Sequence, residues 1–138
     1  MSRWTCPACG REFGRGRQSH VCVPAGTIDD TFSGRRPVQR ATFDAIMRHL
    51  DALGPVHLDA VRVGVFLKRD RKLAEVRPMA RSLSLWLVAG PQASHPRATR
   101  SDRMSGDRTA LVFRLTAVED VDDALRDLLT EAFLLAGE

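Results

Sequence analysis

The sequence predicts an α+β fold in which two main helices flank an antiparallel β-sheet, with a small zinc knuckle in front of it. Two stretches place apolar residues three or four positions apart, which is the period of an amphipathic helix. Between them, apolar and polar residues alternate in short runs separated by turn residues, as in an antiparallel meander. Three cysteines and a histidine crowd the first 22 residues. We therefore divide the chain into a knuckle (1–22), a linker (23–26) and an α+β domain (27–138).

The zinc knuckle is predicted from the spacing of its ligands. Cys6 and Cys9 are two residues apart, so both thiolates can reach one metal ion from a tight turn that Gly10 allows. His20 and Cys22 then supply an imidazole and a third thiolate. These four ligands complete a tetrahedral Zn²⁺ site without an open position, so we expect structural rather than catalytic zinc.

Two helical segments are expected before the sheet. Thr27 and Asp30 have the pattern of a capping box for a short helical turn, which Gly34 would end. Pro37 suits the first position of a longer helix that ends at Gly54. The apolar face of this helix is expected to contain Phe43, Ile46, Met47, Leu50 and Leu53.

The period then changes from about 3.6 residues to two, which predicts strands. We expect one strand along Val61, Val63, Val65 and Leu67, a turn at 70–72, a strand from Leu73 to Pro78, and two further strands at 83–87 and 111–115. Residues 90–109 are rich in Pro, Ser, Gly, Arg and Asp, and are expected to form a long exposed loop.

A final helix is predicted from a capping-box pattern at 116–119. Its apolar face would consist of Val118, Val121, Leu125, Leu128, Leu129 and Ala132. Four acids would lie in its first turn, where the helix dipole stabilises negative charge: Glu119, Asp120, Asp122 and Asp123.

Charge is distributed unevenly along the chain. Residues 62–118 contain twelve Arg or Lys against four acids, a net charge of +8, although the whole chain carries only +4. A sheet with a cationic face could bind nucleic acid, with Phe66 and Trp86 stacking on bases. The alternative is that helices cover this face and both aromatic residues are core. The basic residues assigned to the nucleic-acid site are Arg62, Lys68, Arg69, Arg71, Lys72, Arg77 and Arg81.

Several motifs together resemble the domain-of-unknown-function family 5655, in the form that carries an N-terminal zinc knuckle of ligand order Cys-Cys-His-Cys. They are Trp-x-Cys-Pro-x-Cys-Gly-Arg at 4–11, the His-x-Cys exit, Phe32-x-Gly34 before Pro37, Phe66-Leu67-Lys68, Val76-x-Pro78, and 119–122 leading to 128–133. The resemblance implies an architecture and no reaction. Members usually have a Tyr in the first strand and another near the C-terminus, whereas this chain contains no Tyr.

We expect a cytoplasmic zinc-binding protein that acts as a binding module, with nucleic acid as the leading partner. The sequence contains neither an apolar run of the ~18 residues that a membrane span needs nor the apolar segment of a signal peptide. No catalytic residue is assigned, because His49, His57 and His95 are isolated from any nucleophile pattern and the cysteines are assigned to zinc. A protein–protein adaptor and an enzyme with its site in the α+β domain remain as alternatives.

Overall fold

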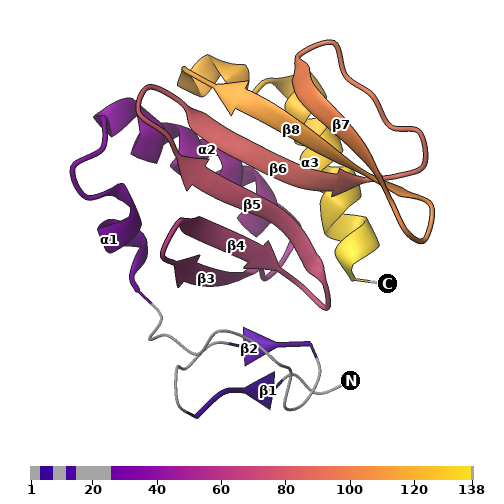
Figure 1. The fold of residues 1–138 in the computed structure, drawn as a ribbon, viewed down its shortest axis with the longest axis horizontal. Coiled ribbons are helices and arrows are strands. Elements are labelled where there is room, and N and C mark those ends of the chain that lie inside the picture. The colour runs from indigo at the N-terminus through magenta and orange to yellow at the C-terminus, as the bar shows by residue number, and fades with distance from the viewer. Residues whose placement is uncertain (1–3, 8–11, 15–25, 138) are drawn as a thin grey trace.

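The computed structural model describes residues 4–7, 12–14 and 26–137. They form a six-stranded antiparallel sheet with helices packed on one of its faces, and a small hairpin near the N-terminus (Figure 1). The α+β class with two main helices is confirmed. Of the four predicted zinc ligands, Cys6 lies in the described part, whereas Cys9, His20 and Cys22 lie outside it.

The large sheet has the strand order β3-β4-β5-β6-β8-β7. Its strands are β3 (His57–Val61), β4 (Gly64–Lys68), β5 (Lys72–Pro78), β6 (Leu83–Ala89), β7 (Ala98–Met104) and β8 (Arg108–Leu115). The chain runs as a meander from β3 to β6, and β8 then pairs with β6 and leaves β7 at the edge. The small hairpin pairs β1 (Trp4–Thr5) with β2 (Glu12–Phe13).

The helices are α1 (Ile28–Phe32), α2 (Pro37–Leu53) and α3 (Asp123–Ala136), with a single 3₁₀ turn, η1 (Val118–Asp120), before the last. The helices α2 and α3 contact each other and cover the same face of the sheet, behind it in Figure 1. None of the described helices combines the length and the apolar character that a membrane span requires.

The core lies between the sheet and these two helices. It is built from alternate residues of the central strands and from one stripe of each helix, among them Ile46, Leu50, Leu67, Leu85, Leu111, Phe113, Leu125 and Leu129. Each of these side chains is at most 1% exposed, and burying one contributes about 1.5–3 kcal/mol to stability. A buried Gln39 ties the start of α2 to the β5–β6 turn, because its Nε2 donates to the carbonyls of Met79 and Ser82, both at 2.7 Å.

The predictions for the first two helices are confirmed at their ends. Thr27 and Asp30 form the reciprocal capping box of α1, and Gly34 follows its last turn with a φ of 73°. The helix α2 begins at Pro37 and Gly54 is its C-terminal cap. One member of the predicted apolar stripe was misplaced, because Leu53, in the last turn, is 40% exposed.

The predicted continuous strand through Val61, Val63, Val65 and Leu67 is wrong. The chain reverses between β3 and β4, with Val61 paired to Gly64 across the two-residue turn Arg62–Val63. Because this turn has two residues, the side chains of Val61 and Val65 lie on opposite faces of the sheet. The side chain of Val63, in the turn itself, is 53% exposed. The alternating valines therefore continue across the turn, and the turn could not be predicted because it contains no Gly, Pro, Asn or Asp.

The predicted long loop at 90–109 is also wrong, because it contains the whole of β7. This strand pairs only with β8, so one of its edges faces away from the sheet, and most of its residues are polar or charged. Charged side chains are typical of edge strands, which use them to discourage pairing with other chains. The strand therefore lacked the apolar alternation from which strands are predicted.

The final helix begins later than predicted. Thr116 to Glu119 do not cap it; instead Asp120 accepts hydrogen bonds from the Thr116 and Ala117 amides and closes the 3₁₀ turn. The cap of α3 is Asp122, which accepts from the Leu125 amide at 3.0 Å. Glu119 and Asp120 thus lie before the helix, as do Val118 and Val121 of the predicted apolar face, and Asp123 is the acid in its first turn.

Candidate nucleic-acid interface

The face of the sheet turned away from α2 and α3, which we call the outer face, carries aromatic and charged side chains in rows across the strands. One row follows the register from β3 to β7 and consists of Asp59, Phe66, Glu75, Trp86, Val112 and Arg100. The next row contains Gly64, Arg77, Ser84 and Arg114. No described helix packs on this face, so the two aromatic residues are not core beneath helices.

A shallow hollow of about 260 Å³ lies at the centre of the outer face. Trp86, on β6, borders it and is partly exposed, and Arg77 and Arg100 border it from β5 on one side and from β7, beyond β8, on the other. Arg114 is exposed and pairs with Ser84, which also borders the hollow. An indole ring flanked by guanidinium groups is the combination that proteins use to bind single-stranded nucleic acid.

Two acids moderate the charge around this hollow. The Nε of Arg100 is 2.6 Å from Asp102, and the guanidinium of Arg77 is 3.9 Å from Glu75. The Arg100–Asp102 pair is largely exposed, and exposed pairs contribute little because water competes with them. A phosphate group could therefore replace the carboxylate at Arg100 at small cost.

Lys72 is half-buried and engaged by neighbouring side chains. Its ammonium lies 4.6 Å from the Phe66 ring centre and 4.7 Å from that of Trp86, and 2.8 Å from the Glu75 carboxylate. Two ring faces and one carboxylate therefore share the cation. Lys72 holds the two aromatic side chains in place, and it is not a freely exposed phosphate contact.

Lys68 is likewise engaged, at the end of the outer face nearest the small hairpin. Its ammonium is 2.7 Å from the buried Asp59, it donates to the Glu12 carbonyl at 3.1 Å, and it lies 4.9 Å from the Phe13 ring centre. Burial alone would raise the pKa of Asp59, but the hydrogen bond and charge of Lys68, with those of His57, hold it below its ordinary value. Lys68 thus joins β2 to the large sheet.

The predicted basic set is divided by the fold. Arg69 turns to the helix side, where it donates to the Phe133 carbonyl at 2.8 Å and lies 3.8 Å from that ring's centre. The exposed members are Arg62, Arg71, Arg77 and Arg81. Arg62 and Arg77 border one hollow together with Arg35, whereas Arg71 lies in the β4–β5 turn at the other end of the strands.

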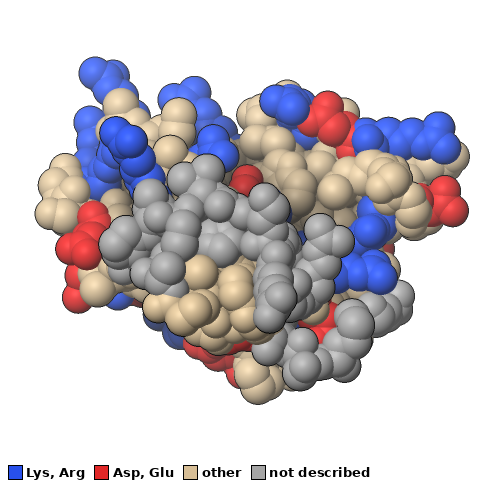
Figure 2. All heavy atoms as spheres, turned by 60° about the horizontal axis from the view of Figure 1, so that its bottom comes forward, with Lys and Arg blue, Asp and Glu red and all other residues tan. Residues whose placement is uncertain are grey.

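The prediction missed Arg100 and Arg114. Arg100 could not be placed on a face because β7 was taken for a loop. Arg114 had a usable signal, since it alternates with the buried Phe113 and Leu115 in a segment that was expected to be a strand. In Figure 2, Lys and Arg side chains gather along the upper rim of the view, on both sides of an uncharged stretch.

Comparison with known proteins places the chain in a family. A family model described as a domain of unknown function, DUF5655, matches residues 28–136. The chain belongs to this family. Among curated proteins and solved structures, no match was found. Membership in DUF5655 accounts for α1 through α3 and the six-stranded sheet, and its description names no activity.

Within the DUF5655 domain, each histidine contacts a neighbouring side chain or main-chain group. His49 on α2 is 2.8 Å from the Thr130 hydroxyl on α3, and His57 is 2.8 Å from Asp59. His95 accepts a hydrogen bond from the Arg97 amide and packs edge-on against Phe113. The residues that the structure describes contain no group of three or more His, Cys, Asp or Glu that could hold a metal ion.

Proposed function

We propose that this protein binds single-stranded nucleic acid through the outer face of its sheet. The observation that carries the proposal is the central hollow, where the partly exposed Trp86 lies between Arg77 and Arg100. A base stacks on the indole, while the guanidinium groups contact the phosphates on either side. A flat sheet face of this kind fits an unstacked strand, and it offers no helix for a major groove.

We further propose that Zn²⁺ folds the N-terminal knuckle through Cys6, Cys9, His20 and Cys22. Cys6 is 5% exposed and forms a small apolar cluster with Phe13 and Trp4, whose ring centres are 6.0 Å apart. Two strands of two residues each bury too little apolar surface to hold such a cluster alone. Three thiols and one imidazole suit structural zinc, whose binding energy replaces the missing core.

Removal of zinc tests the second proposal. We expect a chelator to unfold the knuckle and to leave the DUF5655 domain folded, because their apolar cores are separate. The fluorescence of Trp4 in a Trp86→Phe variant would report the knuckle, and far-UV circular dichroism would report the domain. Loss of both signals in one transition would contradict this independence.

A salt titration of oligonucleotide binding tests the first proposal, using zinc-loaded protein and Trp86 fluorescence in a Trp4→Phe variant. Single strands should quench the fluorescence, and log Kd should rise with log salt at a slope of about 0.7 per phosphate contact, hence about 2 for Arg77, Arg100 and the neighbouring Arg114. Measured by the anisotropy of a fluorescein-labelled strand, which needs no tryptophan, Trp86→Leu should weaken binding by about 1–3 kcal/mol, whereas Trp86→Phe keeps a ring for stacking. Absence of binding at low salt would eliminate this function.

A protein–protein adaptor is the second candidate, and one observation favours it. Val63 and Met79 are 53% and 50% exposed and border a hollow of about 320 Å³ at the end of the sheet. Apolar side chains of this size are typical anchors for a partner protein. A partner bound there should show an affinity that changes little with salt, unlike a nucleic acid.

A further inference from the structure

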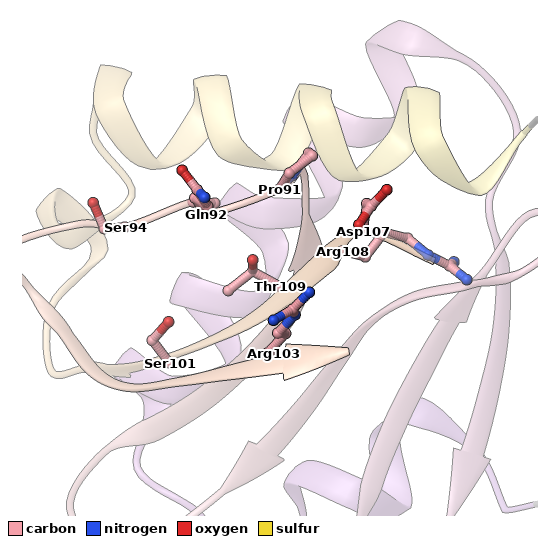
Figure 3. A pocket seen from close by; sticks show the side chains of 9 residues that line it. Pro91, Gln92, Ser94, Ser101, Arg103, Asp107, Arg108 and Thr109 are labelled. Carbon is pink, nitrogen blue, oxygen red and sulfur yellow. The ribbon is translucent and has the colours of Figure 1, made fainter. Parts of the chain in front are cut away.

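A second hollow lies on the other side of the β7–β8 hairpin from Arg100. It encloses about 510 Å³ between this hairpin and the chain that connects β6 to β7. Most of the side chains around it are polar, and the argument uses Gln92, Ser94, Ser101, Arg103, Arg108 and Thr109. Figure 3 shows Ser101, Arg103 and Thr109 on the strands, facing Gln92 and Ser94 across the space. The volume is that of a small-molecule site.

Thr109 carries the strongest indication of a ligand. It is 6% exposed, and within the described ranges its hydroxyl forms no hydrogen bond to the protein. By contrast, the hydroxyls of Thr42 and Thr99 both donate to main-chain carbonyls. A buried hydroxyl without a partner is costly, so native proteins rarely keep one unless something else binds it.

Arg103 is the second indication. In the part of the chain that the structure describes, no carboxylate lies within ion-pair distance of Arg103 or Arg108, whereas Arg97, Arg100 and Arg126 each have at least one. Asp107 is the one acid among the lining residues, so the two arginines leave the hollow a net charge of +1. An unpaired guanidinium beside three hydroxyls favours an anion with several acceptor oxygens.

The backbone bordering the hollow is also unusual. Gln92 and Asp107 have φ values of 56° and 59°, and they are the two residues other than glycine with positive φ in the described ranges. Both line this hollow, one from each side. Both are turn positions, Gln92 in the turn that the Ala93 amide and Gly90 carbonyl close and Asp107 between β7 and β8, so these angles shape the rim of the hollow and are not in themselves an indication of a ligand.

We propose that this hollow binds a phosphomonoester of about mononucleotide size. The fork of Arg103 donates to two phosphate oxygens, and the hydroxyls of Thr109, Ser101 and Ser94 donate to the remaining acceptors. A carboxylate would leave some of these donors unused. The volume exceeds that of inorganic phosphate, so an organic group of nucleoside size fills the rest. This site is on the opposite face of β7 from the central hollow, and it does not depend on the proposed nucleic-acid function.

Calorimetric titration of the zinc-loaded protein (residues 1–138) with adenosine 5′-monophosphate tests the proposal, with adenosine as the uncharged control. The nucleotide should bind and adenosine should not. Arg103→Gln should weaken Kd by tenfold or more, since it removes a charge-assisted contact. Arg48→Gln, an exposed arginine on α2 that borders neither proposed site, should leave Kd unchanged. No binding of the nucleotide at millimolar concentration, or equal binding by Arg103→Gln, would overturn the proposal.

Two hydroxyl variants separate a ligand role from a merely structural one. Thr109→Val keeps the shape of the side chain and should abolish stabilisation by the nucleotide while leaving the melting temperature of the free protein equal or higher. Thr109→Ser restores a hydroxyl and should recover most of the binding. If Thr109→Val binds the nucleotide as the parent does, the hydroxyl is not a ligand contact and the proposal fails. Oligonucleotides with and without a 5′-phosphate then show whether the phosphate comes from a free nucleotide or from a strand end.

Discussion

Arg100 and Arg103 lie three residues apart on β7, and their side chains serve opposite faces of the sheet. Arg100 pairs with Val112 and borders the central hollow of the outer face, whereas Arg103 pairs with Thr109 and borders the hollow behind it. The two positions share a strand, a residue type and exposure. A matched pair of substitutions can therefore separate the two proposed sites with little difference in stability.

We expect Arg100→Gln to weaken binding of a single strand that lacks a terminal phosphate, and to lower the salt slope by about 0.7, the value for one phosphate contact. Arg103→Gln should leave both quantities unchanged. Fluorescence titrations at several salt concentrations measure them. Equal losses in the two variants would show that the charge of β7 acts as a whole and that the outer face is not a defined site.

Gln39→Leu should lower the free energy of unfolding by about 2–4 kcal/mol. The substitution removes three hydrogen bonds, those from Nε2 to the Met79 and Ser82 carbonyls and the one that Oε1 accepts from the Arg36 amide, and each contributes about 0.5–1.5 kcal/mol. Urea unfolding measures the loss. Arg35→Ala is the control, because it removes an exposed hydrogen bond to the same Met79 carbonyl and should cost less than about 0.5 kcal/mol. A neutral Gln39→Leu would mean that these hydrogen bonds add nothing to stability, because the Arg35 guanidinium and the Met79 amide satisfy the two carbonyls by themselves.

Gly64→Ala should destabilise the sheet, because the chain comes too close there for any side chain. A Cβ at this position would lie 2.2 Å from the Val76 carbonyl oxygen, which is a backbone atom and cannot turn away. Overpacking of this kind costs about 1–3 kcal/mol or more. Gly26→Ala is the matched control, since the nearest atom to its Cβ would be 3.8 Å away. Equal denaturation midpoints for the two variants would contradict the close approach of β4 and β5.

Asp59 should make stability depend on pH in the acid range. Because its pKa is lower in the folded protein than in the unfolded chain, its contribution is present above the unfolded value of about 3.9 and is lost as pH falls through the folded value. Asp59→Asn should therefore lower stability at pH 7 and flatten its decline below pH 4. Urea unfolding at pH 7 and pH 3 measures both. A variant with an unchanged acid dependence would show that other carboxylates cause the decline.

The sequence predicted the parts of the fold in which local pattern and burial agree. The helix α2 has a proline at its start, a glycine at its end and an apolar stripe facing the sheet, so both its limits and most of its buried face were predicted. The strands β5, β6 and β8 have an apolar side turned to the core, which gives them a period of two. The zinc ligands remain a prediction, since three of the four lie outside the described residues.

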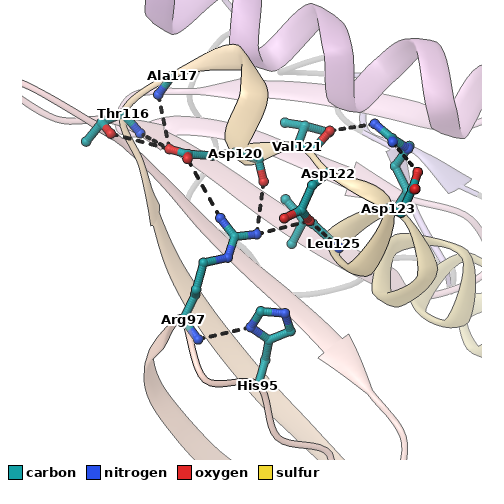
Figure 4. A network of polar contacts seen from close by, with 10 residues as sticks. His95, Arg97, Thr116, Ala117, Asp120, Val121, Asp122, Asp123 and Leu125 are labelled. Carbon is teal, nitrogen blue, oxygen red and sulfur yellow. Dashed lines mark hydrogen bonds and ion pairs between the residues drawn. The ribbon is translucent and has the colours of Figure 1, made fainter.

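The start of α3 shows why some limits could not be predicted. Two acids two residues apart could each cap a helix, and the structure uses Asp120 for the 3₁₀ turn and Asp122 for α3. Arg97, 25 residues before Asp122, donates to the Asp120 carbonyl and the Asp122 carboxylate, each at 3.1 Å (Figure 4). The Leu125 amide, and then the Arg97 charge, lowers the pKa of Asp122. A contact from so far along the chain leaves no local signal.

The candidate sites were harder to predict than the fold. A basic residue can be counted in a sequence, but its partners cannot, and Lys68, Arg69 and Lys72 all proved to have internal ones. The role of Thr109 could not be predicted for the same reason, because only the packed structure shows that its buried hydroxyl has no hydrogen-bond partner among the described residues.

The place of β8 between β6 and β7 also sets an order for folding. Each of the other neighbouring pairs in the large sheet is a hairpin, with its strands next to each other in the chain. The β6–β8 pair instead joins residues up to 32 positions apart, Leu83 and Leu115, so its formation must close a long loop before any contact compensates the lost entropy. We therefore expect β7 and β8 to form a hairpin first and to dock on β6 as a unit, which makes that docking the slow step in folding.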